Sequence, residues 1–196
     1  MERRVAEAAA VLRRGGLVAY PTETFYALGS LARDAAAIAL VAEAKGRPEG
    51  KPLPLLAADR GAVEEVAVLG PAAARLAARF WPGPLTLVLP ARPGLPGPVT
   101  AGGGTVGIRI PGSEIARALA SAAGGAIVST SANASGEAPP VRAADIPPAL
   151  RSRVDLVLDA GPAPGGLPST IVAIGAGEPV LLRAGAVPFE QVLAAL

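Results

Sequence analysis

The order of secondary-structure signals in the sequence predicts an α/β or α+β protein whose sheet has mixed strand direction. Helical periodicities and short apolar runs typical of strands are interleaved along the chain. The length of 196 residues is typical of one domain, and we find no linker long enough to divide it. Because 51% of the residues are hydrophobic and only 3% are aromatic, the core is expected to consist of Ala, Val, Leu and Ile.

The first half of the chain is expected to alternate helices and strands. Apolar residues at helical spacing indicate a first helix, and Gly15 and Gly16 end it. Asp34 is a plausible N-cap for the second helix. The expected elements are a helix over 2–14, a strand over 17–20, a helix over 34–44, a strand over 53–57 and two Ala-rich helices that end at Phe80.

The second half is richer in strands. Ser113 is expected to cap one helix, and the Pro- and Gly-rich stretch 92–104 is interpreted as a long loop. The expected strands are 85–89, 106–110, 127–129, 154–158, 170–174 and 180–182, and the expected helices are 114–122 and 189–196.

The composition excludes several kinds of chemistry. The chain has no Cys and no His, so thiol nucleophiles, Ser-His-Asp triads, His bases, disulfides and the usual zinc sites are absent. The pI of about 9.5 accompanies a formal charge of only +2, which does not indicate nucleic-acid binding. The N-terminus is unlike a signal peptide, and polar or turn-forming residues interrupt both long uncharged runs. We therefore expect a cytoplasmic protein without a membrane partner.

The scarce polar residues are concentrated in a few segments. The only two lysines, Lys45 and Lys51, share one loop with Arg47, and the only Asn, Asn133, follows a predicted strand. Arg109 interrupts an apolar strand, so it either faces solvent or binds an anion. Other hydroxyls lie at Thr22, Thr24, Thr105, Ser129, Ser131 and Ser169.

Each of these segments also has a plainer interpretation. Thr22 and Thr24 would cap a helical turn, the lysine loop would be a solvated turn, and Ser131 and Asn133 would be turn formers. Taken together, the segments instead favour a cleft for a polyanion and a small polar molecule. A nucleoside triphosphate that carries Mg²⁺ on its phosphates is the obvious candidate.

Five segments resemble one known family in the order in which they occur. They are 16–29, 45–48, 81–86, 106–111 and 129–133, and they are similar to motifs of the threonylcarbamoyl-AMP synthases, the YrdC-like family. The resemblance implies a twisted, open mixed sheet flanked by helices, with a basic concave cavity. It also implies synthesis of L-threonylcarbamoyladenylate and pyrophosphate from L-threonine, bicarbonate or CO2, and ATP. The product serves threonylcarbamoyladenosine formation at position 37 of tRNAs.

The resemblance also assigns residues to roles. It implies a catalytic tetrad of Lys45, Arg47, Ser131 and Asn133. The implied ATP-binding residues are Arg47, Lys51, Thr105, Ser131, Pro139 and Arg183, and the implied threonine-binding residues are Thr24, Arg109, Ser129 and Ser169. Leu56 stands where several relatives have a His beside the amino acid. The chain resembles the short form with a single domain, here 1–196.

Two alternatives remain at this point. One is a non-catalytic RNA-binding protein, which would bind tRNA or double-stranded RNA; the few aromatic residues favour it less. The other is a paralogue of the same fold with another small substrate. If the protein is a synthase, its further partner is the machinery that transfers the threonylcarbamoyl group to tRNA.

Overall fold

The computed structural model describes residues 1–46, 50–175 and 178–196. Arg47, predicted to be a member of the tetrad and an ATP ligand, lies outside the described residues. Among the described helices, none is long and apolar enough to cross a membrane.

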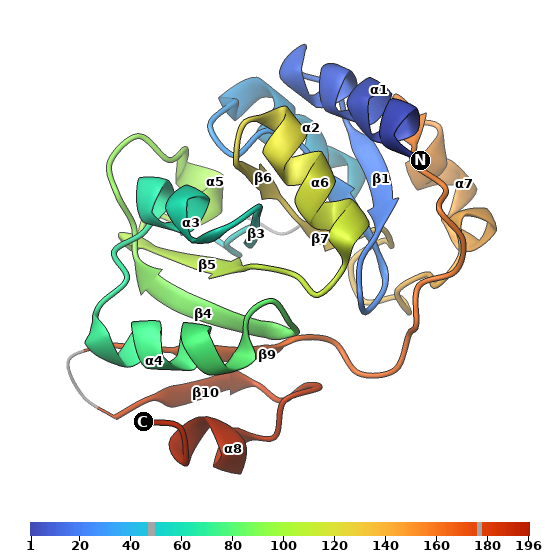
Figure 1. Ribbon diagram of the computed structural model, residues 1–196. Coiled ribbons are helices and arrows are strands. Elements are labelled where there is room, and N and C mark those ends of the chain that lie inside the picture. Colours follow the sequence, from blue (N-terminus) through green and yellow to red (C-terminus); the bar gives the residue numbers. More distant parts are fainter. Residues whose placement is uncertain (47–49, 176–177) are drawn as a thin grey trace.

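The strands form two open sheets, each with parallel and antiparallel neighbours (Figure 1). The smaller sheet has the order β7-β2-β1-β8. It consists of β1 (Val18–Pro21), β2 (Tyr26–Gly29), β7 (Thr130–Ser131) and β8 (Leu156–Val157). Only the β1–β8 pair in it is parallel. The predicted mixed strand direction is therefore confirmed, but the strands are divided between two sheets where the sequence predicts one.

The larger sheet has the order β10-β9-β4-β5-β3-β6. It contains β3 (Leu55–Ala57), β4 (Leu85–Pro90), β5 (Thr105–Arg109), β6 (Ala126–Val128), β9 (Thr170–Ala173) and β10 (Val180–Arg183). The β3–β5 and β4–β9 pairs are parallel, and the other three pairs are antiparallel. Five of these strands were expected from the sequence as strands of similar extent, and β6 ends one residue before the predicted 127–129.

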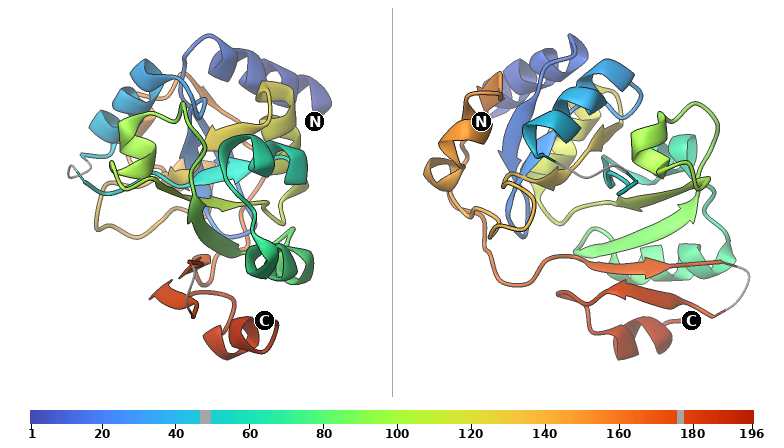
Figure 2. Two further views of the ribbon diagram at one scale, coloured as in Figure 1. Left: turned by 90° about the vertical axis from the view of Figure 1, so that its left-hand side faces the viewer. Right: turned by 180° about the vertical axis from the view of Figure 1, so that it is seen from behind.

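Helices cover the sheets on their outer faces. In Figure 1, α1 (Glu2–Arg13) and α6 (Glu114–Ala123) lie side by side; α1 packs against β1 and β8 of the smaller sheet, and α6 against β1 and against β3 and β6 of the larger sheet. Helix α4 (Pro71–Phe80) lies along β4. Figure 2 shows α8 (Phe189–Leu193) beside β10 at one end of the molecule. The remaining longer helices are α2 (Ala35–Ala44) and α3 (Arg60–Val66). A small core, mostly of Ala, Val and Leu with Tyr20 and Ile127, lies beneath α1 and α6, and a larger core fills the rest.

The helix ends predicted at Asp34, Ser113 and Gly15 are confirmed, whereas α8 ends at Leu193, before the predicted residue 196. Asp34 accepts a hydrogen bond from the Ala37 amide at 3.0 Å, and Ser113 accepts one from the Ala116 amide at 3.3 Å. After α1, Gly15 has a φ of +84°, the left-handed conformation that glycine adopts without steric cost. Local sequence signals therefore set these ends correctly.

Several short elements were not predicted. The elements that the sequence did not predict include strands β2 and β7, helix α7 (Pro148–Arg151) and the 3-10 turn at 143–145. The stretch 92–104, interpreted as a loop, contains the short helix α5 (Gly97–Thr100). The helices α5 and α7 have four residues each, about one turn, which is too short to show a helical periodicity in the sequence.

The two sheets meet at Ser129. This residue alone separates β6 of the larger sheet from β7 of the smaller one. The Ser129 amide donates to the Pro54 carbonyl at 2.9 Å, and the Val128 amide donates to the Ser30 carbonyl at 2.9 Å. The segment that crosses from one sheet to the other thus carries the predicted polar residues Ser129, Ser131 and Asn133.

Candidate active site

A cavity of about 670 Å³ opens where the two sheets meet. Its wall includes residues of β2 and β7 from the smaller sheet and of β3, β4, β5, β9 and β10 from the larger one. The predicted site residues on this wall are Thr24, Lys51, Thr105, Arg109, Ser129, Ser131, Asn133, Pro139, Ser169 and Arg183. Residues distant in the sequence are therefore gathered around one space.

Among the described members of the predicted tetrad, Lys45 does not line the cavity but contacts residues that do. Lys45 follows α2 and is only 4% exposed. Its ammonium donates to the Asn133 carbonyl at 2.6 Å, to Asn133 Oδ1 at 3.3 Å and also to the Ser131 carbonyl. The Lys45 ammonium group therefore holds the 131–133 segment in place.

Asn133 shapes the loop that follows β7. Its Nδ2 donates to the Glu137 carbonyl at 2.6 Å, while its Oδ1 accepts from Lys45. Asn133 is therefore a loop former, as one interpretation of the sequence held, and a cavity-wall residue at the same time. The loop leads to Pro139, which also lines the cavity.

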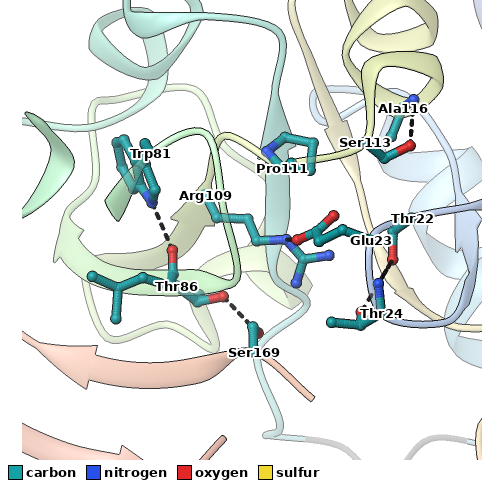
Figure 3. Close-up of polar contacts among 12 residues, drawn as sticks. Thr22, Glu23, Thr24, Trp81, Thr86, Arg109, Pro111, Ser113, Ala116 and Ser169 are labelled. Atoms are coloured by element: carbon teal, nitrogen blue, oxygen red, sulfur yellow. Dashed lines mark hydrogen bonds and ion pairs between the residues drawn. The ribbon is translucent and has the colours of Figure 1, made fainter. Parts of the chain in front are cut away.

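Arg109 forms a buried ion pair with Glu23, as Figure 3 shows. The Arg109 Nε and Glu23 Oε1 atoms are 3.3 Å apart, and the two side chains are 12% and 16% exposed. Neither Arg109 Nε nor either Glu23 oxygen has a well-aligned hydrogen bond to a described residue. Of the two interpretations of Arg109, solvent or anion, the structure favours the anion, here a carboxylate of the chain itself.

Thr22 and Thr24 form a turn and not a helix cap. Thr22 Oγ1 donates to the Phe25 carbonyl at 2.8 Å and accepts from the Thr24 amide at 3.2 Å. Strand β2 follows this turn, so the capping interpretation was wrong. The turn places Glu23 against Arg109 and Thr24 on the cavity wall (Figure 3).

On the part of the cavity wall that the larger sheet forms, the Ser169 hydroxyl contacts two side chains. Its Oγ lies 2.9 Å from Thr86 Oγ1 of β4 and 2.9 Å from Arg183 Nη2 of β10. Arg183 also donates to the Ser169 carbonyl from Nη2 at 2.6 Å and from Nε at 3.1 Å. Three neighbouring strands of the larger sheet therefore bring these groups together.

Basic side chains outnumber acidic ones on the cavity wall, where Glu137 is the one carboxylate among the described lining residues. Burial lowers the pKa of Arg183, and the nearby charge of Arg109 lowers it further. The Arg183 guanidinium group nevertheless stays protonated, because arginine does not lose its proton in proteins. Lys51 adds a third cation to the wall. This electrostatic arrangement suits an anionic ligand.

Two residues of this arrangement were not predicted to be functional. Glu23 lies between Thr22 and Thr24, and Thr86 is the only side chain with a hydroxyl in an otherwise apolar strand. An isolated polar residue in such a strand is the signal that could have identified Thr86. Leu56 is fully buried in the smaller core.

A cavity lined by cations and hydroxyls in an open α/β fold is suited to small anionic ligands. A family model named Sua5_yciO_yrdC, with the description "Telomere recombination", matches residues 10–185. The chain belongs to this family.

Named relatives agree with this membership. The chain is 42% identical to the threonylcarbamoyl-AMP synthase of Bacillus subtilis, over 98% of this chain and 56% of that protein. Pyrococcus abyssi Sua5 complexed with L-threonine has a TM-score of 0.94 and 39% identity, over 100% of this chain and 58% of that one. Escherichia coli YciO has a TM-score of 0.89 and 27% identity, over 98% and 94%. The chain thus spans little more than half the length of the first two relatives.

Proposed function

We propose that the protein is an L-threonylcarbamoyladenylate synthase, a nucleotidyltransferase that uses L-threonine, bicarbonate or CO2, and ATP. One observation carries the proposal: the two sheets gather the described residues that family resemblance assigns to ATP and threonine around one cavity, and Lys45 contacts residues of its wall. The name of the Bacillus relative and the threonine complex of the Pyrococcus relative support it. The product would pass to the machinery that modifies position 37 of tRNAs.

ATP would occupy the part of the cavity between β5, β7 and β10. Lys51 and Arg183 supply positive charge, Thr105 and Ser131 supply hydroxyl groups, and the backbone at Pro139 is available to the nucleoside. Arg47 is proposed to join them. Mg²⁺ would enter with the triphosphate as part of the substrate and neutralise charge on the phosphates. In the part of the chain that the structure describes, no group of three or more acidic side chains could hold a metal ion.

L-threonine would lie between the turn before β2 and the start of β9. Figure 3 shows the terminal nitrogens of Arg109 directed toward the space between Thr24 and Ser169. Because Glu23 faces Nε, these two nitrogens are left for a bidentate contact with the carboxylate of the amino acid. The hydroxyls of Thr24, Ser129 and Ser169 would complete the contacts.

The reaction would depend on positioning and on charge neutralisation. The amine of threonine adds to the carbon of CO2 and loses a proton, which gives a carbamate. A carbamate oxygen then attacks the α-phosphorus of ATP, the bond to the bridging oxygen breaks, and pyrophosphate leaves. Lys51 and Arg183 would stabilise the charge that develops on the leaving group.

Pyrophosphate release by the purified protein tests the proposal. The assay contains ATP, Mg²⁺ and bicarbonate, with L-threonine, L-serine or no amino acid. We expect release that depends on threonine and a product with the mass of threonylcarbamoyladenylate. Binding of ATP without turnover would instead favour a paralogue with another substrate. Binding of tRNA or double-stranded RNA that falls steeply with salt, again without turnover, would favour an RNA-binding protein.

A further inference from the structure

Thr86 is a buried hydroxyl residue on the cavity wall that the proposed mechanism does not use. It is 3% exposed and points from β4 toward the start of β9 (Figure 3). Its Oγ1 lies 2.9 Å from Ser169 Oγ, and either oxygen can be the donor. The direction of this hydrogen bond decides where the proton of Ser169 points.

Arg183 limits the possible directions. A guanidinium group can only donate, so the Nη2 of Arg183 fills one lone pair of Ser169 Oγ, at 2.9 Å. Ser169 then has one lone pair and one proton left. If Thr86 donates to Ser169, both lone pairs are filled and the proton is free to point into the cavity. If Ser169 donates to Thr86, its proton is turned away from a ligand.

A bound carboxylate decides between these two arrangements. The terminal nitrogens of Arg109 point to the space beside Ser169 (Figure 3), so a carboxylate held by Arg109 would share that space with the Ser169 hydroxyl. A charged oxygen is a stronger acceptor than a neutral hydroxyl. The donation from Arg183 also polarises the Ser169 O–H group and strengthens it as a donor. Ser169 therefore donates to the carboxylate, which leaves Thr86 as the donor to Ser169.

We propose that Thr86 is a positioning residue, which, together with Arg183, fixes the Ser169 hydroxyl so that its proton points to the carboxylate of the bound amino acid. This inference rests on the proposed function, because it takes L-threonine as the ligand. Thr86 acts through Ser169 and contributes to amino-acid binding, while the contacts of Arg183 with the Ser169 carbonyl remain as they are.

Calorimetric titration with L-threonine tests the role of Thr86 in matched variants. Thr86→Val keeps the shape of the side chain and removes the hydroxyl, and Thr86→Ser restores the hydroxyl. We expect Thr86→Val to raise the Kd for L-threonine about threefold to tenfold, the effect of about one net hydrogen bond. Thr86→Ser should restore most of the affinity. Under assay conditions, Thr86→Val should raise KM for threonine and leave KM for ATP unchanged.

A double-mutant cycle shows whether the effect passes through Ser169. In a Ser169→Ala background, Thr86→Val should cause no further loss of threonine affinity. Thr170→Val is the matched control, since the buried Thr170 hydroxyl bonds to Val187 and its side chain does not line the cavity. It should lower stability without changing the Kd for threonine.

Three results would overturn the inference. The first is a Thr86→Val protein that binds threonine like the wild type. The second is an equal loss of affinity from Thr86→Val in the Ser169→Ala background. Either result contradicts the role of Thr86 and leaves the proposed function intact. A folded wild-type protein that binds no L-threonine contradicts the proposed function, and this inference with it. The wild-type titration therefore separates the two failures.

Discussion

Lys45 supports the cavity at the level of a single side chain. The ammonium group is enclosed by oxygens of Ser131 and Asn133, which belong to the segment between the two sheets. A lysine in the interior is unusual, because charged side chains are seldom buried unless partners compensate for the lost water. Here the hydrogen bonds give the cation a structural task as well as the proposed part in ATP-dependent chemistry.

Replacing Lys45 by Met tests the structural role of the ammonium group while it keeps the length of the side chain. Met keeps the unbranched side chain but removes the donors, so buried carbonyl oxygens lose a partner. We expect the free energy of unfolding to fall by about 2–4 kcal/mol, since each unpaired buried acceptor costs about 1–3 kcal/mol. Urea denaturation measures this change. Arg60→Met, which removes an exposed ion pair with Glu64, should change stability by less than about 1 kcal/mol. Equal effects would contradict the role of Lys45.

Arg109 is the residue on which threonine recognition is expected to depend most. Arg109→Ala should lower kcat/KM for L-threonine about tenfold to a hundredfold, since a hydrogen bond to a charged group contributes about 1.5–3 kcal/mol. KM for ATP should stay within about twofold. Arg117→Ala is the control, because that guanidinium group bonds to the carbonyls of Pro111 and Gly112 and does not line the cavity. Unchanged threonine dependence in Arg109→Ala would refute the assignment.

Among the elements, β2 depends on close contact with its neighbours. A Cβ atom on Gly29 would lie 2.8 Å from Tyr20 Cε1 on β1 and 2.8 Å from the Val128 carbonyl on β6. Both distances are shorter than those that a Cβ atom normally keeps from a carbon or an oxygen atom of another residue. The glycine therefore lets the smaller sheet approach the larger one beside Ser129, where the cavity forms.

Gly29→Ala should push these sheets apart. We expect a loss of stability of about 1–3 kcal/mol, the usual cost of overpacking, and weaker threonine binding because Ser129 and Ser131 shift. Gly103→Ala is the matched control, since an added Cβ there would make only an ordinary contact, 3.5 Å from the Thr100 carbonyl, and its φ is not positive. Thermal unfolding of both variants gives the comparison. A Gly29→Ala protein as stable as the control would show that the close contact of Gly29 with Tyr20 and Val128 does not limit the stability of the protein.

For the molecule as a whole, two buried tyrosines link stability to alkaline pH. Burial, and then the Asp159 carboxylate that accepts a hydrogen bond from it, raise the pKa of Tyr26 from 10.0 to about 12. Burial also raises the pKa of Tyr20. Because folding raises both pKa values, the folded state holds these protons more tightly than the unfolded state. This stabilisation is complete below pH 10 and is lost as the pH rises through the folded pKa values.

We therefore expect the free energy of unfolding to decline above pH 10. Tyr20 and Tyr26 are the only tyrosines in the chain, so tyrosinate absorbance reports on these two groups alone. The folded protein should show little tyrosinate at pH 10, whereas the protein in denaturant should be about half ionised there. In Tyr26→Phe the decline between pH 10 and about 12 should be shallower. Full ionisation near pH 10 in the folded state would contradict the burial argument.

Local signals in the sequence were enough to predict the longer elements, the helix ends at Asp34, Gly15 and Ser113, and the family. These depend on local signals, namely periodicity, capping chemistry and linear motifs, which act over a few residues. The motifs also identified the residues around the cavity, because a family motif is recognised from the order of its residues along the chain.

The division into two sheets could not be predicted from the sequence, since the short strand β7 is defined by its pairing with β2, which lies far from it in the chain. Only the tertiary structure decided the partners of the polar groups: Glu23 on Arg109, Thr86 and Arg183 on Ser169, and Lys45 on Asn133. Thr86 and Ser169 are 83 positions apart in the chain. Contacts over such separations depend on how the sheets fold against one another, and no local pattern in the sequence records them.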